Sequence, residues 1–119
     1  EVMRRRQAQM EALLENTTLI CVATNANLQH HQLQRIAIQS HDGLARVVVP
    51  VHTFADGDVA FAIAMGVVDT EADDVTVLGM MTTRAVERAL LNSVHHATTL
   101  HGVPAASERT RPNAKPTAP

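Results

Sequence analysis

Strict alternation between large apolar residues and alanine sets residues 58–65 apart, and it constrains the fold more than any other stretch. The large side chains are Val59, Phe61, Ile63 and Met65, and an alanine fills each position between them. Successive side chains of a β-strand point to opposite faces. The pattern therefore predicts a strand with one bulky face and one smooth face. The smooth face would let another layer approach closely.

Three further segments predict that strands and helices alternate along the chain. Residues 17–24 form a β-branched, apolar run without alternation, which is typical of a strand buried on both faces. Residues 29–47 and 75–97 carry apolar residues at helical spacing, and Gly43 inside the first of these helices indicates close packing or a bend. Because two strands alone do not make a stable sheet, we expect this chain to join a larger sheet or to obtain strands from a partner.

The two ends of the chain differ from its centre. Residues 2–14 contain many good helix formers and predict a short helix. Residues 104–119 hold four of the five prolines and almost no large apolar residue, so this segment is expected to be a disordered tail. The single cysteine, Cys21, cannot form an internal disulfide, and its place in a strand run predicts a buried, inert core residue.

Composition argues against several classes of function. The net charge is -2 without a basic stripe, so nothing indicates nucleic-acid binding. No apolar run approaches the ~20 residues that span a bilayer, and no signal peptide is evident, so neither a membrane nor secretion is indicated. We expect a cytoplasmic protein, and the lone cysteine fits a reducing compartment.

Seven histidines raise the possibility of a metal site. Two pairs are adjacent in sequence, at residues 30–31 and 95–96, and neighbours on a helix do not face one another. No cysteine or glutamate completes a known ligand spacing around His41 or His52. We therefore expect no metal and no cofactor, and a metal-binding module is the least favoured function. His41 is expected at a helix end and His52 in a loop near the site.

Three blocks occur in order between residues 16 and 66. The first is the run 16–26, which begins Asn-Thr-Thr; the second is 41–46 with 50–53; the third is 56–62. Taken alone, Asn-Thr-Thr is also a glycosylation sequon or an ordinary strand start. Together the blocks resemble the L-aminopeptidase D-amidase/D-esterase family, which includes the β-peptidyl aminopeptidases.

The resemblance implies a fold, a processing event and a set of partners. Members of this family fold as an αββα sandwich of the N-terminal-nucleophile type and cut themselves once into an α chain and a β chain. Here the cut would lie between Asn16 and Thr17, so residues 1–16 would end the α chain and residues 17–103 would form the β-chain catalytic portion. The chain would then be only the C-terminal portion of the complete fold. The α-chain portion would supply the main oxyanion donor and most of the substrate pocket, and a homo-oligomer is expected.

The resemblance also implies roles for individual residues. Thr17 would be the nucleophile, and the α-amino group freed by cleavage would be its base. Asp56 and Asp58 would be the acidic pair, with Asp58 favoured to hold the Thr17 amine and hydroxyl and Asp56 supporting it. The N–H of Thr18 is a candidate oxyanion donor. Without the resemblance, Asp-Gly-Asp before a strand is usually a solvated turn.

Two functions thus remain open. The favoured one is a self-processing aminopeptidase or amidohydrolase that acts on small peptides, amino-acid amides or esters through an acyl-Thr17 intermediate. The alternative is a non-catalytic assembly domain that keeps the fold without the α-chain half of the site. The enzyme hypothesis fails if the Thr17 side chain lies far from both Asp56 and Asp58, where no small molecule could enter.

Overall fold

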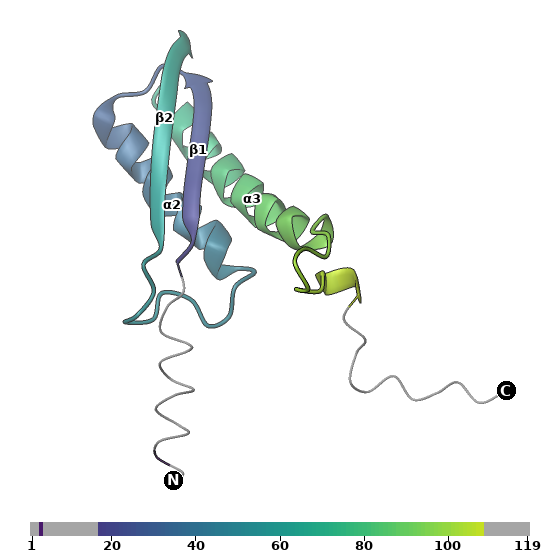
Figure 1. Ribbon diagram of the computed structural model, residues 1–119. Coiled ribbons are helices and arrows are strands. Elements are labelled where there is room, and N and C mark those ends of the chain that lie inside the picture. Colours follow the sequence, from purple (N-terminus) through teal and green to yellow (C-terminus); the bar gives the residue numbers. More distant parts are fainter. Residues whose placement is uncertain (1–2, 4–16, 109–119) are drawn as a thin grey trace, which may run out of the picture.

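The computed structural model describes Met3 and residues 17–108, which form a small α/β structure (Figure 1). Along the chain the elements are β1 (Leu19–Ala26), α2 (His30–Ala45), β2 (Val59–Val68), α3 (Asp74–His95) and the short 3-10 helix η1 (Ala106–Glu108). The predicted order of strands and helices is confirmed, with ends displaced by one to three residues. Apart from Met3, the predicted N-terminal helix lies outside the described residues, as do residues 109–119 of the predicted tail.

The two strands are parallel neighbours, and α2 connects them. Leu19 pairs with Val59, and the register continues unbroken to the pair of Thr24 and Ala64. A bulge then shifts the pairing, so that Ala26 lies opposite Val68. Parallel strands need a crossover connection of this kind, because both must run in the same direction. Their N-terminal ends therefore lie side by side at one edge of the sheet.

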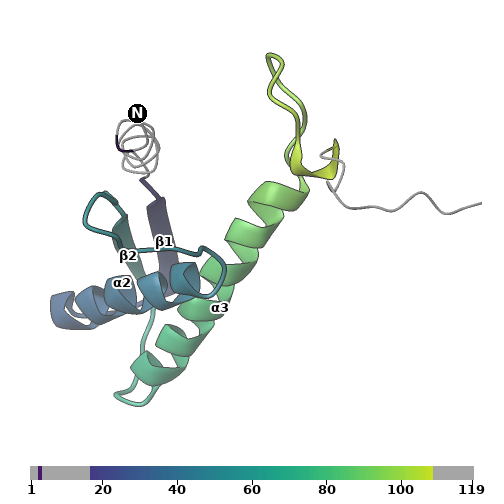
Figure 2. The same ribbon diagram turned by 90° about the horizontal axis from the view of Figure 1, so that it is seen from below.

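Both long helices cover the same face of this sheet (Figure 2). The smooth face of β2 is the one that meets the helices: Ala62 and Ala64 pack against a cluster that contains Ile36 of α2. Ala60 packs against a second cluster of buried residues, formed by Ile20, Leu44 and Val86. The close approach predicted from the alternating alanines is therefore present, and one layer of helices lies on one layer of strands.

The two helices also approach each other closely, and a glycine lies at their contact. A Cβ atom on Gly43 would lie 2.5 Å from the carbonyl oxygen of Thr83 and 2.9 Å from Cβ of Val86. The hydroxyl of Thr83 donates a hydrogen bond across the helix pair to the carbonyl oxygen of Gln39, at 3.1 Å. Of the two alternatives that Gly43 left open, close packing or a bend, the structure shows close packing.

The opposite face of the sheet carries bulky apolar side chains that the described part of the chain does not cover. Leu19, Phe61, Ile63 and Met65 are 72%, 57%, 51% and 71% exposed, and Cys21 is exposed as well. The predictions that the first strand is buried on both faces and that Cys21 is a core residue are thus wrong within residues 17–108. They failed because helices cover only one face here.

Two features of the remaining chain bear on the predictions. The start of the predicted tail, residues 104–108, includes η1, and Ala105 beside it is only 4% exposed. None of the helices in the described part is long and apolar enough to cross a membrane.

Candidate active site

The register of the sheet brings the two candidate site segments together. Since Leu19 pairs with Val59, the preceding residues Thr18 and Asp58 lie side by side just before the strands begin. The backbone N–H of Val59 donates to the carbonyl oxygen of Thr18 at 3.0 Å. In return, the backbone N–H of Thr18 donates to Oδ1 of Asp58 at 2.8 Å. Residues 40 positions apart in sequence are thus fixed to each other.

Thr17, the predicted nucleophile, lies one residue further out, against Gly57. A Cβ atom placed on Gly57 would be 2.8 Å from the Thr17 hydroxyl oxygen and 3.7 Å from its methyl carbon. Thr17 is an exposed residue, and its side chain lies beside the Asp-Gly-Asp segment. The condition that would have excluded the enzyme hypothesis is not met.

Asp58 has the environment of a held carboxylate rather than that of a solvated turn residue. Its side chain is only 7% exposed. One oxygen, Oδ1, accepts the Thr18 N–H, while the other, Oδ2, lies 3.2 Å from Nδ1 of His52. Both oxygens of this acid are therefore engaged by neighbours from different segments.

Asp56 makes different contacts from Asp58. Its Oδ2 accepts the backbone N–H of Thr53 at 2.6 Å, and its own N–H donates to the carbonyl oxygen of Thr53 at 3.1 Å. These two hydrogen bonds close a tight turn in the loop before β2, a frequent use of aspartate. Asp56 thus matches the turn alternative, and it shapes the loop that delivers Gly57 and Asp58.

Two predicted site residues need separate comment. The Thr18 N–H was a candidate oxyanion donor, but its single hydrogen points to Asp58. In this conformation it cannot also bind an oxyanion, so the assignment is corrected. Asn16, the residue on the other side of the predicted cut, lies outside the described residues.

His52 is a site residue whose contact the sequence did not reveal. It was expected in a loop near the site, which is where it lies, but its contact with Asp58 was not foreseen. Its backbone φ is 54°, a left-handed value that few residues other than glycine adopt. Its ring lies 5.1 Å from the ring of His41, near the C-terminal end of α2. Within the described ranges, histidine, cysteine and acidic side chains form no group of three that could hold a metal ion.

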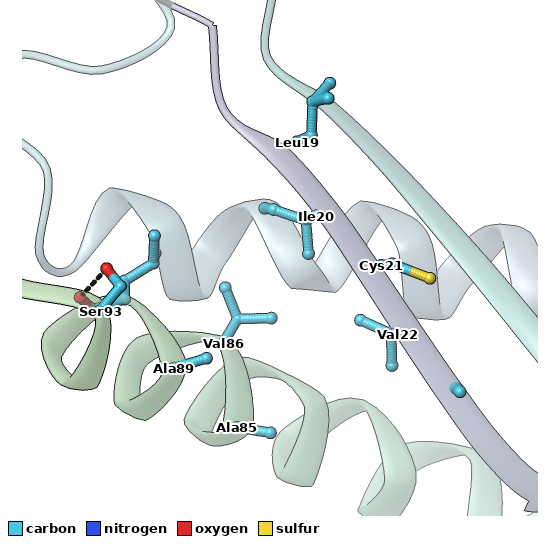
Figure 3. Close-up of a pocket in the computed structure, with 10 residues that line it drawn as sticks. Leu19, Ile20, Cys21, Val22, Ala85, Val86, Ala89 and Ser93 are labelled. Carbon is cyan, nitrogen blue, oxygen red and sulfur yellow. Dashed lines mark hydrogen bonds between the residues drawn. The ribbon is translucent and has the colours of Figure 1, made fainter. Parts of the chain in front are cut away.

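A separate groove runs between β1 and α3 (Figure 3). It encloses about 470 Å³ and is lined by Ile20 and Val22 on the strand side and by Val86 and Ala89 on the helix side, among others. Its walls are largely apolar, and neither Thr17 nor Asp58 lines it. The groove offers packing surface rather than catalytic groups, so the candidate site is the cluster at the N-terminal ends of the strands.

Comparison with known proteins identifies the family. The profile of Peptidase family S58 matches residues 1–107, and the chain belongs to this family. The protein named Uncharacterized aminopeptidase Rv1333 from Mycobacterium tuberculosis (strain ATCC 25618 / H37Rv) is 38% identical over 101 residues, covering 75% of this chain and 29% of the relative. Uncharacterized aminopeptidase ML1167 from Mycobacterium leprae is 37% identical over 101 residues, with 75% and 28% covered. A 6-aminohexanoate-oligomer endohydrolase from Paenarthrobacter ureafaciens is 35% identical over 54 residues, with 45% and 15% covered.

These matches confirm the family resemblance that the three sequence blocks indicated. They also show that the chain spans less than a third of the length of the curated relatives it matches.

Proposed function

We propose that this chain is the C-terminal, catalytic part of a self-processing N-terminal-nucleophile aminopeptidase or amidohydrolase, with Thr17 as nucleophile. The observation that carries the proposal is the position of the Thr17 hydroxyl. It lies against the backbone of Gly57, while Asp58 accepts the very next backbone N–H. A hydroxyl needs a nearby base and a fixed geometry to become a nucleophile, and this cluster supplies both once cleavage has freed an amine.

Self-cleavage begins with the uncut chain. The Thr17 Oγ1 attacks the carbonyl carbon of Asn16 and forms a C–O bond, the C–N bond of the peptide breaks, and the hydroxyl proton ends on the leaving nitrogen. An ester of Asn16 on Thr17 results. Water then adds to this ester, which releases the Asn16 carboxyl group and restores the hydroxyl. Thr17 becomes a residue with a free α-amino group.

The freed amine completes the catalytic residue. An α-amino group titrates near neutral pH, so part of its population is uncharged and can take the hydroxyl proton as a general base. The hydroxyl attacks the substrate carbonyl, the leaving amine or alcohol departs with the proton, and water hydrolyses the acyl-Thr17. Asp58 follows Gly57, the residue that the Thr17 side chain contacts, and its side chain is 7% exposed. Its negative charge would hold the ammonium form of the Thr17 amine.

The proposed substrates are small peptides and amino-acid amides or esters. Support comes from the aminopeptidase names of the mycobacterial relatives and from the amide-bond substrate named for the 6-aminohexanoate-oligomer endohydrolase. The relatives extend far beyond the matched region, so we assign the remaining walls of the substrate pocket and the main oxyanion donor to the rest of the polypeptide.

The same reasoning supports an αββα sandwich for the complete protein. The described part supplies one helix layer and one sheet layer, and the sheet's outer face presents Phe61, Ile63 and Met65 to solvent. In a two-layer domain whose outer sheet face is in water, large apolar side chains are expected on the inner face and small or polar ones on the outer face; here the large side chains are outside and the alanines inside. A second sheet laid on this face would bury them, and the outer sides of the assembled sandwich could then form a homo-oligomer.

Processing provides the test. The protein is expressed at the full length that its gene encodes, and intact mass is followed over time. Wild type should yield two chains with the new N-terminus at Thr17; Thr17→Ser should still cut, since serine retains the hydroxyl, and Thr17→Ala should stay whole. An amino-acid amide should be hydrolysed only by the cut forms. If wild type and Thr17→Ala both remain whole and inert yet form the same oligomer, the non-catalytic assembly domain is the correct function.

A further inference from the structure

His52 combines two features that demand an explanation beyond loop closure. Its backbone is held at φ 54°, in the left-handed region that is unfavourable for a residue with a Cβ atom. Its side chain is 40% exposed, and its Nδ1 lies 3.2 Å from Oδ2 of Asp58. A left-handed backbone angle that brings an imidazole nitrogen within 3.2 Å of the oxygen of a carboxylate that is only 7% exposed indicates that the loop maintains this contact.

We propose that His52 is a positioning residue. Its Nδ1–H would hold the Asp58 carboxylate in the orientation in which Oδ1 accepts the Thr18 N–H, and this hydrogen bond in turn fixes the position of Thr17. The catalytic consequence of this assignment rests on the proposed function of Thr17. The chain of contacts itself does not, because it runs from His52 to Asp58 to the Thr18 backbone in the structure.

Two anchors on different oxygens restrict a carboxylate in a way that one anchor cannot. The terminal torsion of aspartate is broad, so a single hydrogen bond leaves the carboxylate plane free to rotate. With Oδ1 accepting the Thr18 N–H and Oδ2 lying 3.2 Å from Nδ1 of His52, rotation of the carboxylate plane is restricted at both oxygens. Each oxygen can accept a second hydrogen bond, so the fixed carboxylate can still receive the Thr17 amine after cleavage.

The rival explanation is that His52 only packs the loop onto α2, since its ring lies 5.1 Å from that of His41. Three substitutions separate the two roles. His52→Gly accepts the left-handed backbone but removes the donor. His52→Asn tolerates the same backbone and keeps an N–H donor at the δ position. His52→Gln retains a larger side chain but places its amide one atom too far along.

The first measurement does not depend on activity. The full-length protein with Thr17→Ala is labelled with 15N-threonine, and amide hydrogen exchange is followed at Thr18, with the buried helical Thr83 as internal control. His52→Gly and His52→Gln should each speed Thr18 exchange by about tenfold or more. The reason is that Asp58, which accepts the Thr18 N–H, loses the donor on His52 that orients it. His52→Asn should leave it within about threefold of the parent, by the same reasoning. Thr83 exchange should not change, which establishes that the fold is retained.

The second measurement is the processing rate with Thr17 restored. His52→Gly and His52→Gln should cut about tenfold or more slowly, whereas His52→Asn should recover most of the rate. Unchanged Thr18 exchange in both His52→Gly and His52→Gln overturns the inference. Faster exchange with an unchanged processing rate overturns its catalytic part. Failure of the proposed function looks different: wild type and Thr17→Ala would both stay whole, while Thr18 exchange would still report on His52.

Discussion

Adding one methyl group at Gly57 should slow the chemistry without weakening the fold. Gly57 is exposed, and its backbone is not in the left-handed region, so alanine can adopt the same conformation. Gly→Ala at such a position typically stabilises a protein by about 0.4–1 kcal/mol, since the unfolded chain loses freedom. In the described structure, the contact that an alanine Cβ would violate is the one with the Thr17 side chain. Stability and activity should therefore move in opposite directions.

The size of the effect follows from the distance. The new Cβ would lie 2.8 Å from the Thr17 hydroxyl oxygen, whereas ordinary contacts begin at 3.4 Å. The hydroxyl must therefore move by at least about 0.6 Å or rotate to another staggered position. A misplacement of about 1 Å at a reacting atom can cost about 100-fold in rate. We expect Gly57→Ala to process between about tenfold and 100-fold more slowly than wild type.

The assay is intact mass against time for freshly synthesised full-length protein, with urea unfolding of the uncut Thr17→Ala forms to measure stability. Thr17→Ser combined with Gly57→Ala serves as the matched control. Serine lacks the methyl group that lies 3.7 Å from the added atom, so its hydroxyl has room to reorient and should recover part of the rate. Wild-type processing by a folded Gly57→Ala protein would refute the idea that the hydroxyl reacts from its place against Gly57.

Two further predictions concern packing. In the folded full-length protein Cys21 should resist maleimide and react once urea is added, because the proposed second sheet would cover it. Rapid labelling of Cys21 in the native protein would contradict that layer. Gly43→Ala should lower the free energy of unfolding by about 1–3 kcal/mol, since its Cβ would overlap the Thr83 carbonyl oxygen and the Val86 side chain. Urea midpoints of the two proteins measure the difference, and equal midpoints would show that the helices can separate without loss.

Sequence patterns predicted the elements well because the relevant forces are local and periodic. The alternation in residues 58–65 located β2, and the helical stripes located α2 and α3. Gly43 indicated close packing or a bend, and the structure shows close packing, which the missing side chain allows. Burial was harder to predict: Cys21 lies in an apolar run, yet it is exposed in the described part of the chain because the helices cover only the other face of the sheet (Figure 2).

The sequence indicated which residues to consider for the candidate site, but it did not indicate their contacts. The three blocks drew attention to Thr17, Asp56 and Asp58, and the structure brings their segments together. What the acids touch depends on the loop conformation before β2, which no periodicity encodes. One carboxylate turned to Thr53 and the other to Thr18, and His52 joined the site through a left-handed backbone angle.

The alternation that shapes the core also sets the geometry of the site. Asp58 directly precedes β2, so the pairing of Leu19 with Val59 fixes its place beside Thr18. A slip of β2 by one residue would turn every side chain to the opposite face. Phe61 would then be forced against α2, and Asp58 would leave the Thr18 N–H. The alanine face therefore disfavours the register that would separate Asp58 from Thr18, so the packing of the core and the geometry of the candidate site depend on the same strand register.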